Sequence, residues 1–191
     1  MNRLKFSIRQ ARRDDAPTIA LAVAMAIGDE EALRHYCGDD YQEVLTEMAR
    51  AEGTQYSWQN ALISECDCKA AGAIVGYDGA LLGPLRKGTF QILLKQTGRI
   101  PTIPDETASD EYYLDSVAVM PEFRGCGVGS ALITAMRDKA FAEGHQRVGL
   151  LVDEDNRRAK TLYTSLGFET VGYRLFFGHR MHHLQTVQSS N

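Results

Sequence analysis

The sequence has 191 residues, 44% of them hydrophobic, and its 21 basic and 25 acidic side chains give a formal net charge of −4. This length fits one domain, and the hydrophobic fraction excludes an intrinsically disordered chain. The charge balance argues against a protein that binds nucleic acid by phosphate attraction. No segment reaches the roughly 20 apolar residues of a membrane-spanning helix, so we expect no membrane partner.

The N-terminus and the cysteines bear on the cellular compartment. Residues 1–13 lack the apolar run and the cleavage site of a secretory leader, which predicts a cytoplasmic protein. Cys66 and Cys68 lie one residue apart and lack both the spacing and the second ligand pair of a zinc site. We therefore expect reduced thiols and no metal.

Apolar periodicity predicts the elements of the first part of the chain. The apolar face of the first helix is predicted to contain Ile19, Val23, Ala26 and Ile27. In chain order, the predicted elements are a strand at 4–8, a helix from Asp14 or Asp15 to Gly28, a helix at about 41–51, and two antiparallel strands at 61–64 and 72–77.

Residues 79–110 show the least regular pattern. A short helix around 90–95 precedes two prolines and an acidic stretch that includes Asp105, Asp110 and Glu111. Connections of this length are more often functional than idle, so we predict a variable insertion or lid that is mobile without ligand. Its acidic end suggests a cationic acceptor.

Stronger signals follow Glu111. A run of apolar and small residues predicts a strand covered on both faces. The predicted elements are a strand at 112–119, a helix at about 127–143, a strand at 148–152, a helix that begins at Asn156, and a tail at 170–184 that forms one long strand or two strands broken at 178–179. This order predicts a mixed α/β single domain.

A glycine-rich turn separates the strand at 112–119 from the next helix. Glycines at 125, 127 and 129 allow the backbone to approach a ligand closely, and the first amides of a helix attract anions. Arg124 and Ser130 add hydrogen-bond donors. The pattern predicts a diphosphate site, although a turn that needs glycines only for its own shape would read the same way.

Two motifs in this half of the chain resemble one family. Residues 114–129 read LDSVAVMPEFRGCGVG, in which Arg124, Gly127 and Gly129 match the (Arg/Gln)-x-x-Gly-x-(Gly/Ala) signature of the GNAT superfamily of acyl-CoA N-acyltransferases. Residues 156–168 are similar to the family's Asn-x-x-Ala…Leu-Tyr-x-x-x-Gly-Phe segment. The resemblance is strong over 111–172, weak over 4–28 and absent over 79–110.

The resemblance implies a single GNAT domain over 1–191, with a mixed central sheet, helices on both faces and a V-shaped splay between the two central strands. It implies acetyl-CoA as co-substrate, with the pantetheine arm in the splay and the pyrophosphate on the turn. The implied cofactor-binding residues are Val117, Ala118, Val119, Arg124, Gly125, Cys126, Gly127, Val128, Gly129, Ser130, Asn156, Ala159 and Tyr163.

The resemblance also assigns catalytic roles, each with a simpler alternative. Tyr163 would protonate the departing thiolate as a general acid, but it also lies on an apolar helical face and could be a core residue. Asn156 could serve only as a helix cap. The strand at 148–152 carries no carboxylate, so Glu111 and Asp115 are the available bases, and we select Asp115. Its alternative is a carboxylate bonded to backbone at a strand edge.

These features predict transfer of an acetyl group from acetyl-CoA to a primary amine, by direct attack in a ternary complex. The acceptor would be a small molecule, a peptide N-terminus or a lysine. One alternative is a catalytically weak acyl-CoA sensor of the same fold. Another is a dinucleotide-binding oxidoreductase, whose Gly-x-Gly-x-x-Gly fingerprint finds Ser130 at its third glycine position. The tail strand is long enough to pair with a second subunit, which leaves a homodimer open.

Overall fold

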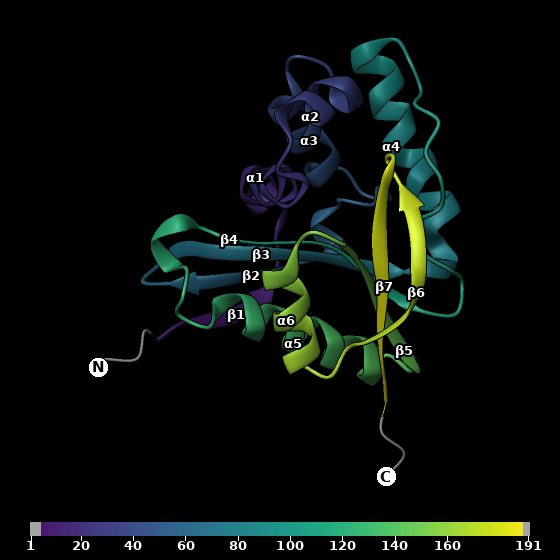
Figure 1. Ribbon diagram of the computed structural model, residues 1–191. Coiled ribbons are helices and arrows are strands. Elements are labelled where there is room, and N and C mark those ends of the chain that lie inside the picture. Colours follow the sequence, from purple (N-terminus) through teal and green to yellow (C-terminus); the bar gives the residue numbers. More distant parts are fainter. Residues whose placement is uncertain (1–4, 189–191) are drawn as a thin grey trace.

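The structure is a computed structural model that describes residues 5–188, so residue 4 of the first predicted strand and both ends of the predicted domain lie outside the described residues. A seven-stranded sheet in the order β1-β2-β3-β4-β5-β7-β6 runs through the molecule (Figure 1). Only the β4–β5 pair is parallel. The strands are β1 (Ser7–Gln10), β2 (Ala61–Cys66), β3 (Lys69–Asp78), β4 (Tyr112–Val119), β5 (Arg147–Asp153), β6 (Glu169–Phe176) and β7 (His179–Val187).

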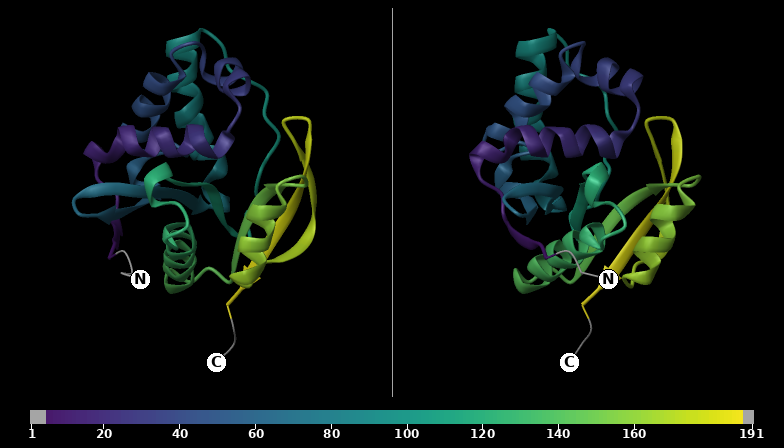
Figure 2. Two further views of the ribbon diagram at one scale, coloured as in Figure 1. Left: turned by 60° about the vertical axis from the view of Figure 1, so that its left-hand side comes forward. Right: turned by 90° about the vertical axis from the view of Figure 1, so that its left-hand side faces the viewer.

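Helices cover both faces of this sheet, as predicted (Figures 1 and 2). On one face, α1 packs on β3 and β4, and α3 packs on α1. On the other face, α5 packs against β2, β3 and β4. The helices are α1 (Ala16–Ile27), α2 (Glu30–Cys37), α3 (Tyr41–Arg50), α4 (Leu82–Thr97), α5 (Val128–Ala142) and α6 (Arg157–Ser165). Among the described residues, no helix is both long and apolar enough to cross a membrane.

The predicted splay is present between β4 and β5. These strands pair only over residues 112–114 and 148–150, although β4 continues to Val119 and β5 to Asp153. Beyond these pairs the two halves of the sheet diverge (Figure 2). The divergence begins next to a β-bulge: Val75 pairs with Ser116 and Gly76 with Leu114, which leaves Asp115 without a partner on β3. A bulge bends its strand and turns the extra side chain in a new direction.

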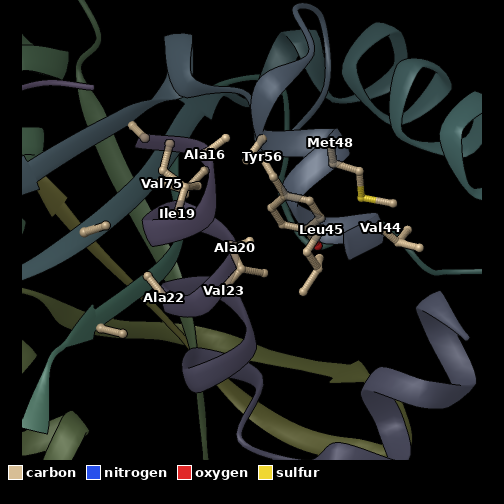
Figure 3. Close-up of a cluster of buried hydrophobic side chains, with 14 of the residues drawn as sticks. Ala16, Ile19, Ala20, Ala22, Val23, Val44, Leu45, Met48, Tyr56 and Val75 are labelled. Carbon is tan, nitrogen blue, oxygen red and sulfur yellow. The ribbon is translucent and has the colours of Figure 1, made fainter. Parts of the chain in front are cut away.

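Small and branched side chains of α1 fill the core on one face of the sheet (Figure 3). Ile19 and Val23 are fully buried, as predicted, together with alanines that allow α3 to approach closely. The prediction was wrong for Ala26 and Ile27, which are exposed because Ala24 and Met25 are the residues of the last turn that pack on the core.

The structure corrects the prediction for residues 79–110. A helix of 16 residues, α4, replaces the short helix expected around 90–95, and it packs against α2 and α3. Pro84 lies in its first turn, where proline is tolerated. A Cβ on Gly88 would collide with the carbonyl oxygen of Gly53, so this glycine serves close packing and does not break the helix. Pro84 and Gly88 are typical helix breakers, so the sequence pattern did not predict the full helix.

One further difference concerns α2, while the tail follows one of its two predicted alternatives. The sequence did not predict α2, although Asp29 caps it by accepting hydrogen bonds from the amides of Glu31 and Ala32 at 2.9 and 3.1 Å. The helix has only eight residues, so few positions show its apolar periodicity, although its acidic first turn is typical of a helix start. The tail forms two strands, β6 and β7, which are joined at Phe177 and Gly178.

Candidate functional site

The glycine-rich turn presents free backbone amides to open space. Residues 124–127 are exposed, and Gly125 and Gly127 have φ values of +77° and +85°, which side chains rarely adopt. Gly127 precedes α5, whose first intrahelical bond runs from the Ala131 amide to the Gly127 carbonyl at 3.0 Å. The amides before Ala131 therefore have no helical partner and remain available to an anion. Nothing lies within 4 Å of a Cβ built on Gly127.

The side chains of this turn differ in the groups that they present to a ligand. The Arg124 Nε donates to the Val119 carbonyl at 3.2 Å, so its guanidinium folds back on the end of β4. Val128 is fully buried in the core beneath α5, so its side chain faces away from a ligand at the turn. Cys126 is an exposed free thiol at the turn, and Ser130 is half-buried in the first turn of α5.

The edge of β4 beyond the bulge faces the open side of the splay. Val117, Ala118 and Val119 pair with β3 on one side, and none of them pairs with β5 on the other. Val117 and Val119 lean on the core beneath α5, while Ala118 packs toward α1. A ligand in the splay would therefore find unpaired main-chain groups of β4 along one wall.

Asn156 and Ala159 begin α6 on the β5 side of the splay. The Asn156 side-chain oxygen accepts from the Ala159 amide at 3.1 Å, so Asn156 is a helix cap. This role leaves its amide nitrogen as the group that could contact a ligand. Ala159 is half-buried against the core under α6 and keeps that helix close to the sheet.

Tyr163 lies one turn further along α6 and is half-buried. Its ring meets Phe168 edge-on, with centroids 6.0 Å apart and an interplanar angle of 65°. Burial raises the pKa of Tyr163 to about 12. The phenol therefore stays protonated at neutral pH and has a proton to give there. Packing on Phe168 and proton donation are compatible, because the ring makes the first contact and the hydroxyl would make the second.

Asp115, the bulge residue, lies where β4 and β5 separate. Its Oδ1 accepts from the Ser116 hydroxyl at 2.7 Å, and the Tyr77 hydroxyl lies 3.2 Å from its Oδ2. Burial, followed by the negative charge of Glu106, raises the pKa of Asp115 to about 7. Within residues 5–188 no arginine, lysine or histidine forms a salt bridge with it. A carboxylate in this state is suited to accept a proton.

Four polar side chains linked to Asp115 were not predicted from the sequence. Glu106 is 3% exposed and accepts hydrogen bonds from Tyr77 at 2.7 Å and from the Gln55 side chain at 2.6 Å. Glu106 also forms an ion pair with Arg86 of α4. These residues come from β3, α4 and two separate loops, so no local spacing links them. The acidic character of the stretch around Glu106 was the only signal.

Glu111, the other candidate base, has a structural environment. Its buried carboxylate accepts from His183 at 2.9 Å, from Gln185 at 2.6 Å and from Thr107 at 2.8 Å. It lies over Gly149 of β5, where a Cβ would overlap it. Burial alone would raise the pKa of Glu111, but the hydrogen bonds from these partners outweigh it and the pKa is lowered. Glu111 thus fastens the end of the 79–110 segment to β7.

The acidic residues that suggested a cationic acceptor already have partners. Asp105 pairs with Arg86 at 2.6 Å, and Asp110 pairs with Arg147. Glu111 is bound as described above. These partners weaken the acidic stretch as support for a cationic acceptor. A hollow of about 370 Å³ on α4 is lined by neither Asp115 nor Tyr163.

Comparison with known proteins gives a family and a fold. A family model described as the acetyltransferase (GNAT) family matches residues 30–168. A solved acetyltransferase structure shares 30% sequence identity, covers 95% of this chain and 98% of its own, and superposes with a TM-score of 0.80. An N-acetyltransferase from Staphylococcus aureus Mu50 shares 27% identity over 94% of this chain and all of its own, with a TM-score of 0.81.

Curated relatives match over shorter segments. An acetyltransferase of Pectobacterium atrosepticum is 42% identical over 60 residues, which cover 31% of this chain and 40% of the relative. The thialysine N-epsilon-acetyltransferase of Bos taurus is 40% identical over 55 residues, which cover 29% of this chain and 32% of the relative. The chain thus matches less than half the length of each of these relatives.

Proposed function

The chain belongs to the acetyltransferase (GNAT) family, and on this premise we propose that it moves an acetyl group from acetyl-CoA to a primary amine. The observation that carries the proposal is the position of Asp115. It lies where β4 and β5 part, and the same strand leads to the glycine-rich turn. One strand thus connects a group that can accept a proton with a site that can hold a diphosphate.

The residues around the splay suit the two ends of acetyl-CoA. The free amides at Gly127 and in the first turn of α5 would bind the pyrophosphate, because they offer donors and the positive end of a helix dipole. The unpaired edge of β4 from Val117 to Val119 would bind the amide groups of the pantetheine arm. Asn156 would add one side-chain donor from α6.

In the chemical step, the amine nitrogen attacks the thioester carbonyl carbon. A carbon–nitrogen bond forms, and the carbon–sulfur bond breaks. Asp115 takes the proton that the amine loses, and Tyr163 gives a proton to the departing CoA thiolate. General acids and bases of this kind typically contribute about 10²–10⁴ in rate each. The raised pKa of Tyr163 keeps its phenol protonated for the acid role. A pKa of about 7 makes Asp115 a stronger base than an ordinary carboxylate and leaves about half of it ionised at neutral pH.

The amine acceptor is supported by relatives as well as by the site. The name of the bovine relative specifies an Nε amine, although it matches only 29% of this chain. The acceptor would reach the acyl group beside Asp115, between the first helices and the β6–β7 hairpin. The Tyr36 ring of α2 meets Phe177 of that hairpin edge-on, with centroids 6.4 Å apart, so these two elements approach each other.

A thiol-release screen tests the proposal. Acetyl-CoA is incubated with the protein and a panel of small amines, peptides with free N-termini and lysine peptides, and free CoA is measured together with the mass of the acetylated product. We expect at least one amine class to give both signals. Tight acetyl-CoA binding without product from any member of the panel would contradict the transferase and favour the acyl-CoA sensor.

A further inference from the structure

Asp115 is connected to the 79–110 segment through one hydroxyl group. The Tyr77 oxygen lies 2.7 Å from Oε1 of Glu106 and 3.2 Å from Oδ2 of Asp115. A hydroxyl has one proton to donate, and only the shorter distance falls within the usual range of an O–H···O bond. The Tyr77 hydroxyl therefore donates its proton to Glu106. Asp115 lies beside this hydroxyl without receiving a full hydrogen bond.

Glu106 is held rigidly enough to impose this choice. The Gln55 side-chain nitrogen donates to Oε1 of Glu106 at 2.6 Å and to the Tyr77 oxygen at 3.2 Å. Arg86 pairs with the other carboxylate oxygen, and the side chains of Arg86 and Glu106 are only 12% and 4% exposed. A buried, charge-assisted pair of this kind is stronger and more precisely oriented than a surface ion pair.

We propose that Glu106 is a positioning residue, which draws the Tyr77 proton away from Asp115 and places a second negative charge behind it, so that Asp115 remains free to accept a proton. This inference rests on the proposed role of Asp115 as the general base. Loss of a hydrogen-bond donor and the presence of a like charge both favour the protonated form of a carboxyl group. The pKa of Asp115 is raised first by burial and then by the charge of Glu106, which agrees with the second of these effects.

The inference gives the 79–110 segment a part in the chemistry. Arg86 lies on α4 and Glu106 on the loop that follows it, so this segment would set the working state of a base on β4. Its attachment at Glu111 would keep that loop in place. The charged and hydrogen-bonding groups that act on Asp115 or sense its charge are Glu106, Arg86, Ser116, Tyr36, Tyr56, Tyr77 and Tyr113.

A direct titration of Asp115 tests the inference. Protein labelled with ¹³C at the aspartate carboxyl carbons is titrated by NMR, and the Asp115 signal is identified by its absence in Asp115→Asn. Glu106→Gln keeps the shape and removes the charge, so we expect the Asp115 midpoint to fall by roughly one pH unit. Tyr77→Phe removes a hydroxyl whose proton the inference assigns to Glu106, so the Asp115 midpoint should change much less than in Glu106→Gln.

Asp105→Asn is the matched control, because Asp105 binds the same Arg86 but is exposed and does not contact Tyr77. The Asp115 midpoint in Asp105→Asn should equal that of the wild type. An unchanged midpoint in Glu106→Gln overturns the inference, and so does an equal shift in Asp105→Asn. Should Glu106→Gln fail to fold, Tyr77→Phe decides, and a midpoint raised by about one pH unit in that variant overturns the inference, because it would show that Tyr77 donates its proton to Asp115.

Kinetics on the same proteins separate this inference from the proposed function. With an amine identified by the thiol-release screen, the acidic limb of the kcat/KM profile should move with the NMR midpoint in Glu106→Gln. A limb that stays in place while the midpoint moves overturns the positioning role. If Asp115→Asn keeps the wild-type rate, the proposed base role fails, whatever the titrations show.

Discussion

Two carboxylates at the start of β4 lie four residues apart and have opposite environments. Glu111 receives hydrogen bonds from His183, Gln185 and Thr107, which lower its pKa despite burial. Asp115 is buried next to a second carboxylate, which raises its pKa to about 7. By linkage, Glu111 stabilises the fold above the pKa it would have in the unfolded chain and loses this contribution as the pH falls. Asp115 has a raised pKa, so its effect is the opposite: it makes the fold less stable as the pH rises.

The raised pKa of Asp115 predicts a cost in stability at neutral pH. The folded protein binds a proton here that the unfolded chain releases near pH 4, so this site loses stability as the pH rises from about 4 to 7. Asp115→Asn should therefore raise the free energy of unfolding by about 1–3 kcal/mol at pH 8 and by little at pH 4. Urea denaturation at the two pH values measures this difference. If Asp115→Asn were less stable than the wild type at pH 8, this would contradict the description of Asp115 as a buried carboxylate without a salt-bridge partner.

Tyr163 is the residue whose two roles are easiest to separate. Tyr163→Phe keeps the ring that packs on Phe168, so the thermal midpoint should change little. If the hydroxyl protonates the thiolate, kcat should fall by roughly 10²–10⁴ while the KM for acetyl-CoA stays within a few-fold. Tyr173→Phe, at an exposed tyrosine on β6, is the control and should keep full activity. Wild-type kcat in Tyr163→Phe would leave Tyr163 as a core residue.

At the scale of elements, the end of the 79–110 segment is fastened to the sheet by Glu111. Glu111→Ala would leave His183 and Gln185 without their buried partner and remove the side chain that covers Gly149. We expect the free energy of unfolding to fall by about 2–4 kcal/mol, the usual cost of unpaired buried polar groups. Asp110→Ala removes an exposed ion pair from the same loop and should cost less than about 1 kcal/mol. Chemical denaturation measures the free energy of unfolding of both variants. Equal losses in Glu111→Ala and Asp110→Ala would contradict the role of Glu111 in attaching this segment to the sheet.

The sequence predicted the elements whose signals are local. The strand at 112–119, the helix that begins after Gly127 and the Asn156 cap follow from apolar periodicity, glycine positions and capping chemistry. The bulge at Asp115 was not predictable, because it is defined by pairing with Val75 and Gly76 nearly 40 residues away. The contacts of Glu106 with Tyr77 and Gln55 also join residues that lie far apart in the sequence, so they form only once the chain has folded.

At the scale of the whole molecule, the described sheet has an opening between β4 and β5 and ends in the edge strands β1 and β6. The opening has α1 above and α5 below its β4 side (Figures 1 and 2). On the edge strand β6, Tyr173 and Leu175 are exposed. Exposed apolar side chains on an edge strand suit pairing with a second copy, so a homodimer through β6 stays a prediction.

The central claim is that the opening and the glycine-rich turn together hold acetyl-CoA. Calorimetric titration of acetyl-CoA into the wild type, Gly127→Val and Gly144→Val tests it most directly. Gly127 and Gly144 stand at opposite ends of α5, both have positive φ, and neither has an atom within 4 Å of a Cβ. The two substitutions therefore carry similar backbone strain, of about 1–3 kcal/mol.

Only Gly127→Val places a side chain over the amides that would meet the pyrophosphate. We predict that the wild type and Gly144→Val bind acetyl-CoA with affinities within a few-fold of each other, and that Gly127→Val shows no measurable binding while its circular dichroism spectrum remains that of a folded protein. Wild-type affinity in a folded Gly127→Val protein would contradict the account.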